Sequence, residues 1–89
     1  MDPRIMRLMA AIRAEAGARR ISIKALAARA EISYPAIHRY LKGQRSMDLS
    51  QFYRIADALG VSVADLLAEA ARTDPLAEGR VIDSRPTSN

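Results

Sequence analysis

The 89-residue sequence contains no cysteine, which excludes disulfide frameworks, zinc sites built on cysteine ligands and cysteine nucleophiles. Aromatic residues make up only 4% of the chain, whereas a β-sandwich would need more aromatic and β-branched side chains. No apolar run approaches the roughly 20 residues of a membrane-spanning helix. Together with the abundant alanine, these absences predict a small all-α domain with one modest core.

Charge is divided unevenly along the chain. Residues 1–47 contain ten Lys and Arg against three Asp and Glu, whereas residues 48–89 contain four against seven. This division suggests that one face meets a polyanion, and nucleic acid is the leading candidate. From charge alone, basic side chains that merely solvate helix surfaces are an equally good explanation.

Apolar residues at helical spacing, with capping residues beside them, predict five α-helices. The first three span about residues 3–16, 22–29 and 34–42, with the start of the third at either of two neighbouring residues. Gly17 and Gly43 close the first and the third, because glycine commonly ends helices.

The fourth helix begins at Asp48, with Gln51 in the capping-box position, and ends at Gly60. The fifth begins at Ser62, where Asp65 repeats the cap signature. The side chains expected to face the core are Ile5, Leu8, Met9, Ile12, Ala16, Leu26, Ala27, Ala30, Ile37, Tyr40, Leu41, Leu49, Phe52, Ile55, Ala56, Leu59, Val63, Leu66, Leu67 and Ala70.

The composition changes after Arg72. A Thr-Asp-Pro sequence breaks any helix there, and the residues that follow are mostly polar. We therefore divide the chain into a helical domain over residues 1–72 and a polar C-terminal tail over residues 73–89, which is expected to be mostly disordered on its own. Residues 80–83 could pair as a short strand if a sheet edge were offered.

The spacing between the second and third predicted helices is the most informative feature. A tight turn at residues 30–33 joins two short helices, as in a helix-turn-helix unit. Ala27 is small where the two helices cross, Ile32 fills the turn, and Ile37 anchors the third helix. A generic helical hairpin has similar spacing, so the spacing alone leaves both structures open.

Residues 21–67 resemble the lambda-repressor/Cro-like helix-turn-helix proteins, also called the XRE family. With the first helix included, the resemblance covers nearly all of residues 3–70. It implies a compact five-helix fold, all-α, that binds double-stranded DNA. The matching elements are Ser22, Leu26-Ala27, Ile32-Ser33, Ile37, Gly43 and the run IADALGVSVADLL at residues 55–67.

Two features depart from the family pattern. Glu31 stands in the turn where members usually have glycine, and a left-handed backbone there costs about 1 kcal/mol. Leu41 replaces an acidic residue that in many members pairs with an arginine on the first helix. Ala16 stands at the position of that arginine, so we expect an apolar contact in place of the ion pair.

The resemblance also implies which side chains contact DNA. Arg39 is the strongest candidate for a base contact, because a guanidinium bonds guanine O6 and N7 together; a phosphate contact or a solvated surface is the alternative. Ile23 stands where members often carry a phosphate-contacting glutamine, so that contact is expected to be lost. The residues expected to contact bases are Ser33, Tyr34, Pro35, His38 and Arg39. Those expected to contact phosphates are Ser22, Lys24, Lys42, Gln44, Arg45 and Ser46.

At the level of function, the resemblance implies a transcriptional regulator, most simply a repressor, that binds a pseudo-palindromic operator as a homodimer. Val63, Leu67 and Ala71 of the fifth helix are the expected dimer contacts, although helix propensity alone also explains the alanines there. We expect a cytoplasmic, nucleoid-associated protein.

Catalysis is not expected, because the chain shows no paired carboxylates, no nucleophile–base pair and no phosphate-binding loop. We also expect no cofactor and no metal, since His38 is the only histidine and has no carboxylate at helical spacing in its own helix. The alternative function is a protein-interaction module such as an antitoxin, in which residues 76–83 of the tail order on a partner.

Overall fold

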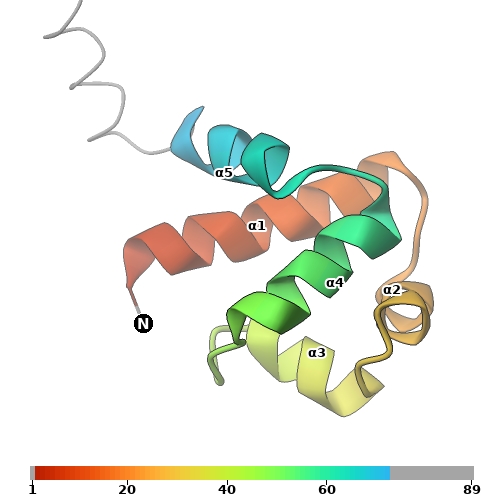
Figure 1. Cartoon of the computed structure of the whole chain (residues 1–89). Coiled ribbons are helices and arrows are strands. Elements are labelled where there is room, and N and C mark those ends of the chain that lie inside the picture. Colours follow the sequence, from red (N-terminus) through yellow and green to blue (C-terminus); the bar gives the residue numbers. More distant parts are fainter. Residues whose placement is uncertain (1, 73–89) are drawn as a thin grey trace, which may run out of the picture.

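This computed structural model describes residues 2–72, which fold into five α-helices joined by short turns and loops (Figure 1). The helices are α1 (Pro3–Ala18), α2 (Ile23–Ala30), α3 (Tyr34–Leu41), α4 (Leu49–Leu59) and α5 (Val63–Arg72). The predicted all-α fold of five helices is therefore confirmed. The predicted tail, the strand at residues 80–83 and the partner-binding segment at residues 76–83 lie outside the described residues.

Side-chain caps begin the last four helices where the sequence predicted them. The hydroxyl oxygens of Ser22, Ser33 and Ser62 each accept a hydrogen bond from the backbone N–H three residues on, at 3.0, 3.3 and 3.0 Å. Asp48 and Gln51 form a complete capping box, each side chain accepting from the other's backbone N–H. Because each cap satisfies an N–H that has no partner within its helix, each stabilises its helix by about 1 kcal/mol.

The predicted end of the first helix was wrong. α1 continues through Gly17 to Ala18, and the left-handed residue that ends it is Arg20, with φ 58°. The N–H of Ile21 then donates to the carbonyl of Ala16 at 2.8 Å, a closing bond that usually has glycine at the left-handed position. Arginine there costs about 1 kcal/mol, so glycine spacing alone misplaced the helix end.

The core is assembled from one face of every described helix. Ile12, Leu26, Ile37, Ile55 and Leu66 are fully buried, and each comes from a different helix. Removing each such side chain from water contributes roughly 1.5–3 kcal/mol. These contacts hold α1 and α4 between α5 at one end of the molecule and α3 at the other (Figure 1).

Three residues that were predicted to face the core lie at the surface instead. Ile5, Leu49 and Leu67 are 40%, 64% and 50% exposed. On α5, Leu66 occupies the buried position, and Leu67 is rotated by about 100° around the helix axis. The helical spacing of apolar residues predicted these three as core. That spacing does not distinguish the residues of the buried stripe from an exposed apolar residue next to the stripe.

Candidate nucleic-acid interface

The turn between α2 and α3 has the helix-turn-helix geometry that the spacing predicted. Glu31 adopts the left-handed conformation, with φ 59° and ψ 41°, at the position where the sequence predicted it. The N–H of Ile32 donates to the carbonyl of Ala27 at 3.0 Å, and the Ile32 side chain is buried in the core. Two short helices are thereby held at a fixed angle by a turn with its own core residue.

One face of α3 is anchored in the core, and the other is exposed at the edge of the molecule. Ile37, Tyr40 and Leu41 are buried, whereas Tyr34 and Arg39 are exposed on the outer face. In Figure 1, α3 lies at the opposite end of the molecule from α5, so its outer face is not covered by another described helix.

The five residues expected to contact bases lie together on this outer face or at its N-cap. Tyr34 and His38 are one turn apart, with ring centroids separated by 5.7 Å and planes tilted by 57°. His38 is half-buried, which is consistent with the tilted ring of Tyr34 beside it. Arg39 is exposed, and within the described residues no ion pair holds its guanidinium. Ser33 and Pro35 are also exposed.

The six residues expected to contact phosphates are all exposed, and they lie on both sides of α3. Ser22 caps the start of α2 and accepts from a backbone N–H, which leaves its own hydroxyl proton free to donate. The guanidinium of Arg45 lies over the ring of Tyr40, 5.8 Å from the centroid, and this contact ties the loop after α3 to the core. The remaining exposed members of the group are Lys24, Lys42, Gln44 and Ser46.

α3 and the loop residues 42–47 that follow it carry no carboxylate. Residues 32–47 contain no Asp or Glu. The carboxyl groups with shifted pKa values among the described residues lie instead beside or on α1 and α5. A hydrogen bond from Arg4 lowers the pKa of Asp2, and one from Arg19 lowers the pKa of Glu15. A hydrogen bond to Glu15 raises the pKa of Glu69.

Arg13 is a positioning residue that sequence reasoning missed. Its guanidinium donates a hydrogen bond to the carbonyl oxygen of Leu41, the last residue of α3. That carbonyl has no acceptor role within its own helix, and a cation there also complements the negative end of the helix dipole. Ala16 and Leu41 are both buried, as expected if they have exchanged an ion pair for apolar packing. A main-chain carbonyl is present at every residue, so the sequence does not reveal which one accepts a bond from a distant arginine. The one available signal was that Arg13 lies one turn before Ala16, the position where family members carry an arginine.

The outward face of α5 carries two of the three residues predicted as dimer contacts. Leu67 and Ala71 are exposed, together with Ala64 and Ala68 at the same helical face. Val63 differs, because it is half-buried and packs against the core. The predicted set therefore mixes an inward residue with two outward ones.

No helix within residues 2–72 is long and apolar enough to cross a membrane. In the same residues, no group of three or more His, Cys, Asp or Glu side chains is placed so that it could hold a metal ion.

A helix-turn-helix unit whose second helix presents an exposed, acid-free face defines a DNA-binding domain. Comparison with known families agrees, because the Cro/C1-type HTH DNA-binding domain matches residues 11–68. The chain belongs to this family of DNA-binding domains, and the resemblance stated from the sequence is confirmed.

A solved structure is also similar to this one. The crystal structure of the clp gene regulator ClgR from Corynebacterium glutamicum superimposes with a TM-score of 0.76 at 26% sequence identity. The similarity covers 96% of this chain and 89% of that chain. No curated protein matches the sequence.

Proposed function

We propose that the protein is a transcriptional repressor that binds double-stranded DNA sequence-specifically, as a homodimer on a pseudo-palindromic operator. The observation that carries this proposal is the outer face of α3, where an exposed guanidinium stands on a helix free of carboxylates. Similarity to a gene regulator supports the link between DNA binding and transcription.

Base recognition is proposed for the first two turns of α3. The major groove admits an α-helix, and Arg39 can bond O6 and N7 of one guanine there. Pro35 has no N–H but presents an apolar ring to a thymine methyl group. Tyr34 brings a hydroxyl near the sugar-phosphate backbone, and its contact with His38 limits the movement of both rings.

Phosphate contacts are proposed on both sides of the groove that α3 enters. On one side, the start of α2 offers free N–H groups beside Ser22 and Lys24. On the other side, the segment 42–46 offers the side chains of Lys42 and Arg45. Such contacts fix the register of the protein on DNA without reading its sequence.

A homodimer is proposed because one recognition helix reads only a few base pairs, too few to compete against a genome of non-specific sites. Two helices related by a two-fold axis would lie about 34 Å apart, one turn of DNA. α5 supports this assembly: Leu66 and Ala70 are buried in the core, whereas Leu67 and Ala71, each about 100° further round the helix, are apolar and exposed. An exposed apolar stripe beside the buried one is a surface on which a second protein can pack.

Repression is the simplest consequence of such binding, since a protein that occupies promoter DNA blocks other proteins by steric overlap. The experiment that tests the whole proposal is selection of bound sites from random duplexes, followed by sequencing. We expect enrichment of an inverted repeat with half-site centres about 10 base pairs apart. Recovery of a single unrepeated site would contradict the homodimer, and equal recovery of all sequences would contradict sequence-specific binding.

A further inference from the structure

The chain turns back on α3 directly after the helix ends. The N–H of Gly43 donates to the carbonyl of Tyr40 at 3.0 Å, and the N–H of Gln44 donates to the carbonyl of Arg39 at 2.9 Å. Gly43 has φ 76°, the left-handed conformation that this pair of closing bonds requires. The reversal brings Arg45 back alongside the last turn of α3.

Arg45 rests there on the ring of Tyr40. The carbon at the centre of its guanidinium lies 5.8 Å from the ring centroid, within the range of a cation–π contact. Tyr40 is only 4% exposed and belongs to the core together with Ile37 and Leu41, so its ring is fixed. A buried ring therefore holds an exposed side chain that is otherwise among the most flexible in proteins.

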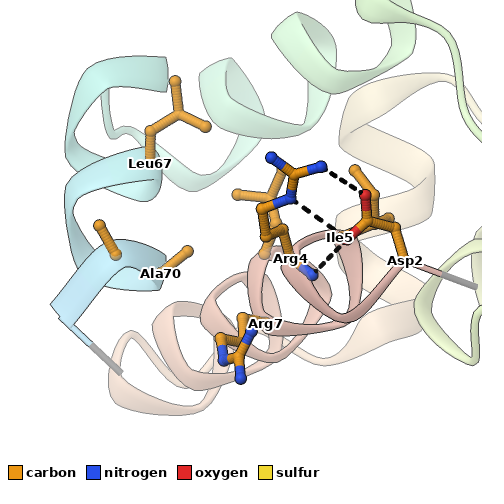
Figure 2. A pocket seen from close by; sticks show the side chains of 8 residues that line it. Asp2, Arg4, Ile5, Arg7, Leu67 and Ala70 are labelled. Carbon is orange, nitrogen blue, oxygen red and sulfur yellow. Dashed lines mark hydrogen bonds and ion pairs between the residues drawn. The ribbon is translucent and has the colours of Figure 1, made fainter. Parts of the chain in front are cut away.

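The contact differs from those of two other arginines. Arg4 forms an ion pair of 2.9 Å with Asp2, which Figure 2 shows at the start of α1. Arg19 forms an ion pair of 2.9 Å with Glu15. In both cases a carboxylate of the chain occupies N–H groups of the guanidinium. The face of an aromatic ring occupies none of the five N–H donors of Arg45.

No carboxylate within residues 2–72 forms an ion pair with Arg45. The acidic residue next along the chain, Asp48, accepts the backbone N–H of Gln51 at 2.8 Å in the capping box of α4. The guanidinium of Arg45 is thus held in place by its face, and its donors are available to an anion from outside the chain.

We propose that Tyr40 is a positioning residue for DNA binding, because its buried ring holds the Arg45 guanidinium ready for a phosphate of the DNA backbone. The inference rests on the phosphate contact proposed for Arg45 and adds the residue that preorganises it. Preorganisation raises affinity because the side chain is ordered on folding and not at the expense of binding. Sequence reasoning assigned Tyr40 to the core alone.

The test is a double-mutant cycle, measured as affinity for a selected DNA duplex over a range of salt concentrations. Arg45→Ala is expected to weaken binding about fivefold and to reduce the slope of log affinity against log salt by about one. Tyr40→Leu keeps an apolar side chain but removes the ring, and it should weaken binding about two- to fivefold. In the Arg45→Ala background, Tyr40→Leu should have no further effect on affinity.

Tyr40→Phe separates the ring from the rest of the side chain. It keeps the surface on which the guanidinium rests, so affinity should stay within about 1.5-fold of the unsubstituted chain. Because Tyr40 is buried, Tyr40→Leu is expected to lower the stability of the fold in both backgrounds. Circular dichroism therefore accompanies each titration, and affinities are compared at a temperature where every variant is folded.

Arg45→Lys leaves the core untouched. Lysine keeps the charge but has no planar group to lie on the ring, so binding should weaken about two- to threefold while the salt slope stays the same. Arg54→Ala is the matched control for a lost arginine, since Arg54 is exposed on α4, and its affinity should stay within about twofold.

Nuclear magnetic resonance shows directly whether the contact persists on DNA. The ring of Tyr40 should shift the side-chain proton signals of Arg45 upfield in the free protein, and Tyr40→Leu should abolish the shift. We expect the shift to remain after DNA is added. Its loss on binding would mean that Arg45 leaves the ring to reach phosphate, and it would overturn the proposal.

The outcomes of the cycle distinguish this inference from the function on which it rests. If Arg45→Ala reduces the salt slope but Tyr40→Leu weakens binding equally in both backgrounds, the phosphate contact stands and the role of Tyr40 is wrong. Stronger binding by Tyr40→Leu would show that the ring withholds Arg45 from DNA. An unchanged slope in Arg45→Ala would remove the phosphate contact and the positioning role together.

Discussion

The α2–α3 unit and α5 both bury one face in the same core, but their outer faces differ in chemistry. The outer surface of α2 and α3 carries Lys24, Arg29 and Arg39, with no carboxylate on either helix. The outer surface of α5 carries Leu67 and three alanines. Both inner faces are apolar and buried, so the contrast between the two regions lies in their outer surfaces.

The comparison separates what each surface is suited to bind. Cationic side chains on a helix that can enter the DNA major groove favour binding to DNA, because they neutralise phosphates and release the counterions condensed on them. Small apolar side chains suit close approach of another protein surface. The outer surfaces of α3 and α5 lie at opposite ends of the molecule (Figure 1).

The largest effect is expected from a charged substitution on the apolar outer surface of α5. Ala71→Lys places a charge in the proposed dimer interface and is expected to weaken dimer formation by about 2–4 kcal/mol, because the charge loses its hydration without gaining a partner. Operator affinity should fall with dimer formation while the unfolding midpoint changes little. Ala18→Lys is the matched control, since Ala18 is an exposed alanine near the other end of α1 and is not a proposed dimer contact. Equal losses in the two variants would contradict the proposed interface.

The next effect concerns the cationic side. Arg39→Ala is expected to cost about 1–3 kcal/mol on the selected site and to relax preference at one base pair. The control is Arg54→Ala, because Arg54 is also an exposed arginine but lies on α4. Competition binding against singly mutated sites measures both effects. A uniform loss on every sequence would reassign Arg39 to a phosphate contact.

Arg13→Met tests how the recognition surface is held. Methionine keeps an apolar stem but cannot donate to the Leu41 carbonyl, and the free energy of unfolding should fall by about 1–2 kcal/mol. DNA affinity should fall on all sequences alike, because the end of α3 loses its support. Urea denaturation beside an Arg29→Met control provides the measurement, and equal stability of both variants would show that the bond contributes nothing.

Lys42→Ala distinguishes a phosphate contact, which positions the protein, from a base contact, which reads the sequence. The loss should be about 0.5–1 kcal/mol on every sequence, and the slope of log affinity against log salt should decrease by about one. Affinity measured from low to moderate salt gives this slope. An unchanged slope would remove Lys42 from the DNA interface.

The smallest expected effect lies between α1 and α5. Protonated Glu69 donates to Glu15, and the raised pKa of Glu69 means that this stabilisation is present at acid pH and is lost as pH rises through that pKa. Glu69→Gln donates at every pH but loses the 4.0 Å ion pair with Arg72, so it should raise the thermal midpoint by at most about 1 °C at neutral pH. The gain should vanish below about pH 4, where wild-type Glu69 is also protonated. A gain that persists in acid would mean that the carboxyl pair is not its source.

Helix starts were predictable from the sequence because their signals are local. The serines at positions 22, 33 and 62 accept from N–H groups only three residues away, and the Asp48–Gln51 box spans a single turn. The left-handed turn at Glu31 was equally local, since it follows from the spacing of two helices.

What the sequence could not supply depends on contacts between distant segments. Leu49 and Leu67 fit an apolar pattern, and only the packing of neighbouring helices decides which side of that pattern is buried. Arg13 and Leu41 are 28 residues apart, and the acceptor is a main-chain oxygen that every residue possesses.

The hydrogen bond from Arg13 to the Leu41 carbonyl means that the two halves of α1 have different structural roles. The second half of the helix holds the end of α3, and the first half packs against α5, which carries the proposed dimer contacts Leu67 and Ala71. In the proposed dimer, the first half of α1 then influences the separation of the two recognition helices, and its second half influences the tilt of each one in the DNA groove. The hydrogen-bonding preference of Arg39 depends on neither end. In the proposed dimer, substitutions where α1 packs on α5 are therefore expected to change the spacing of the half-sites while the half-site sequence stays the same.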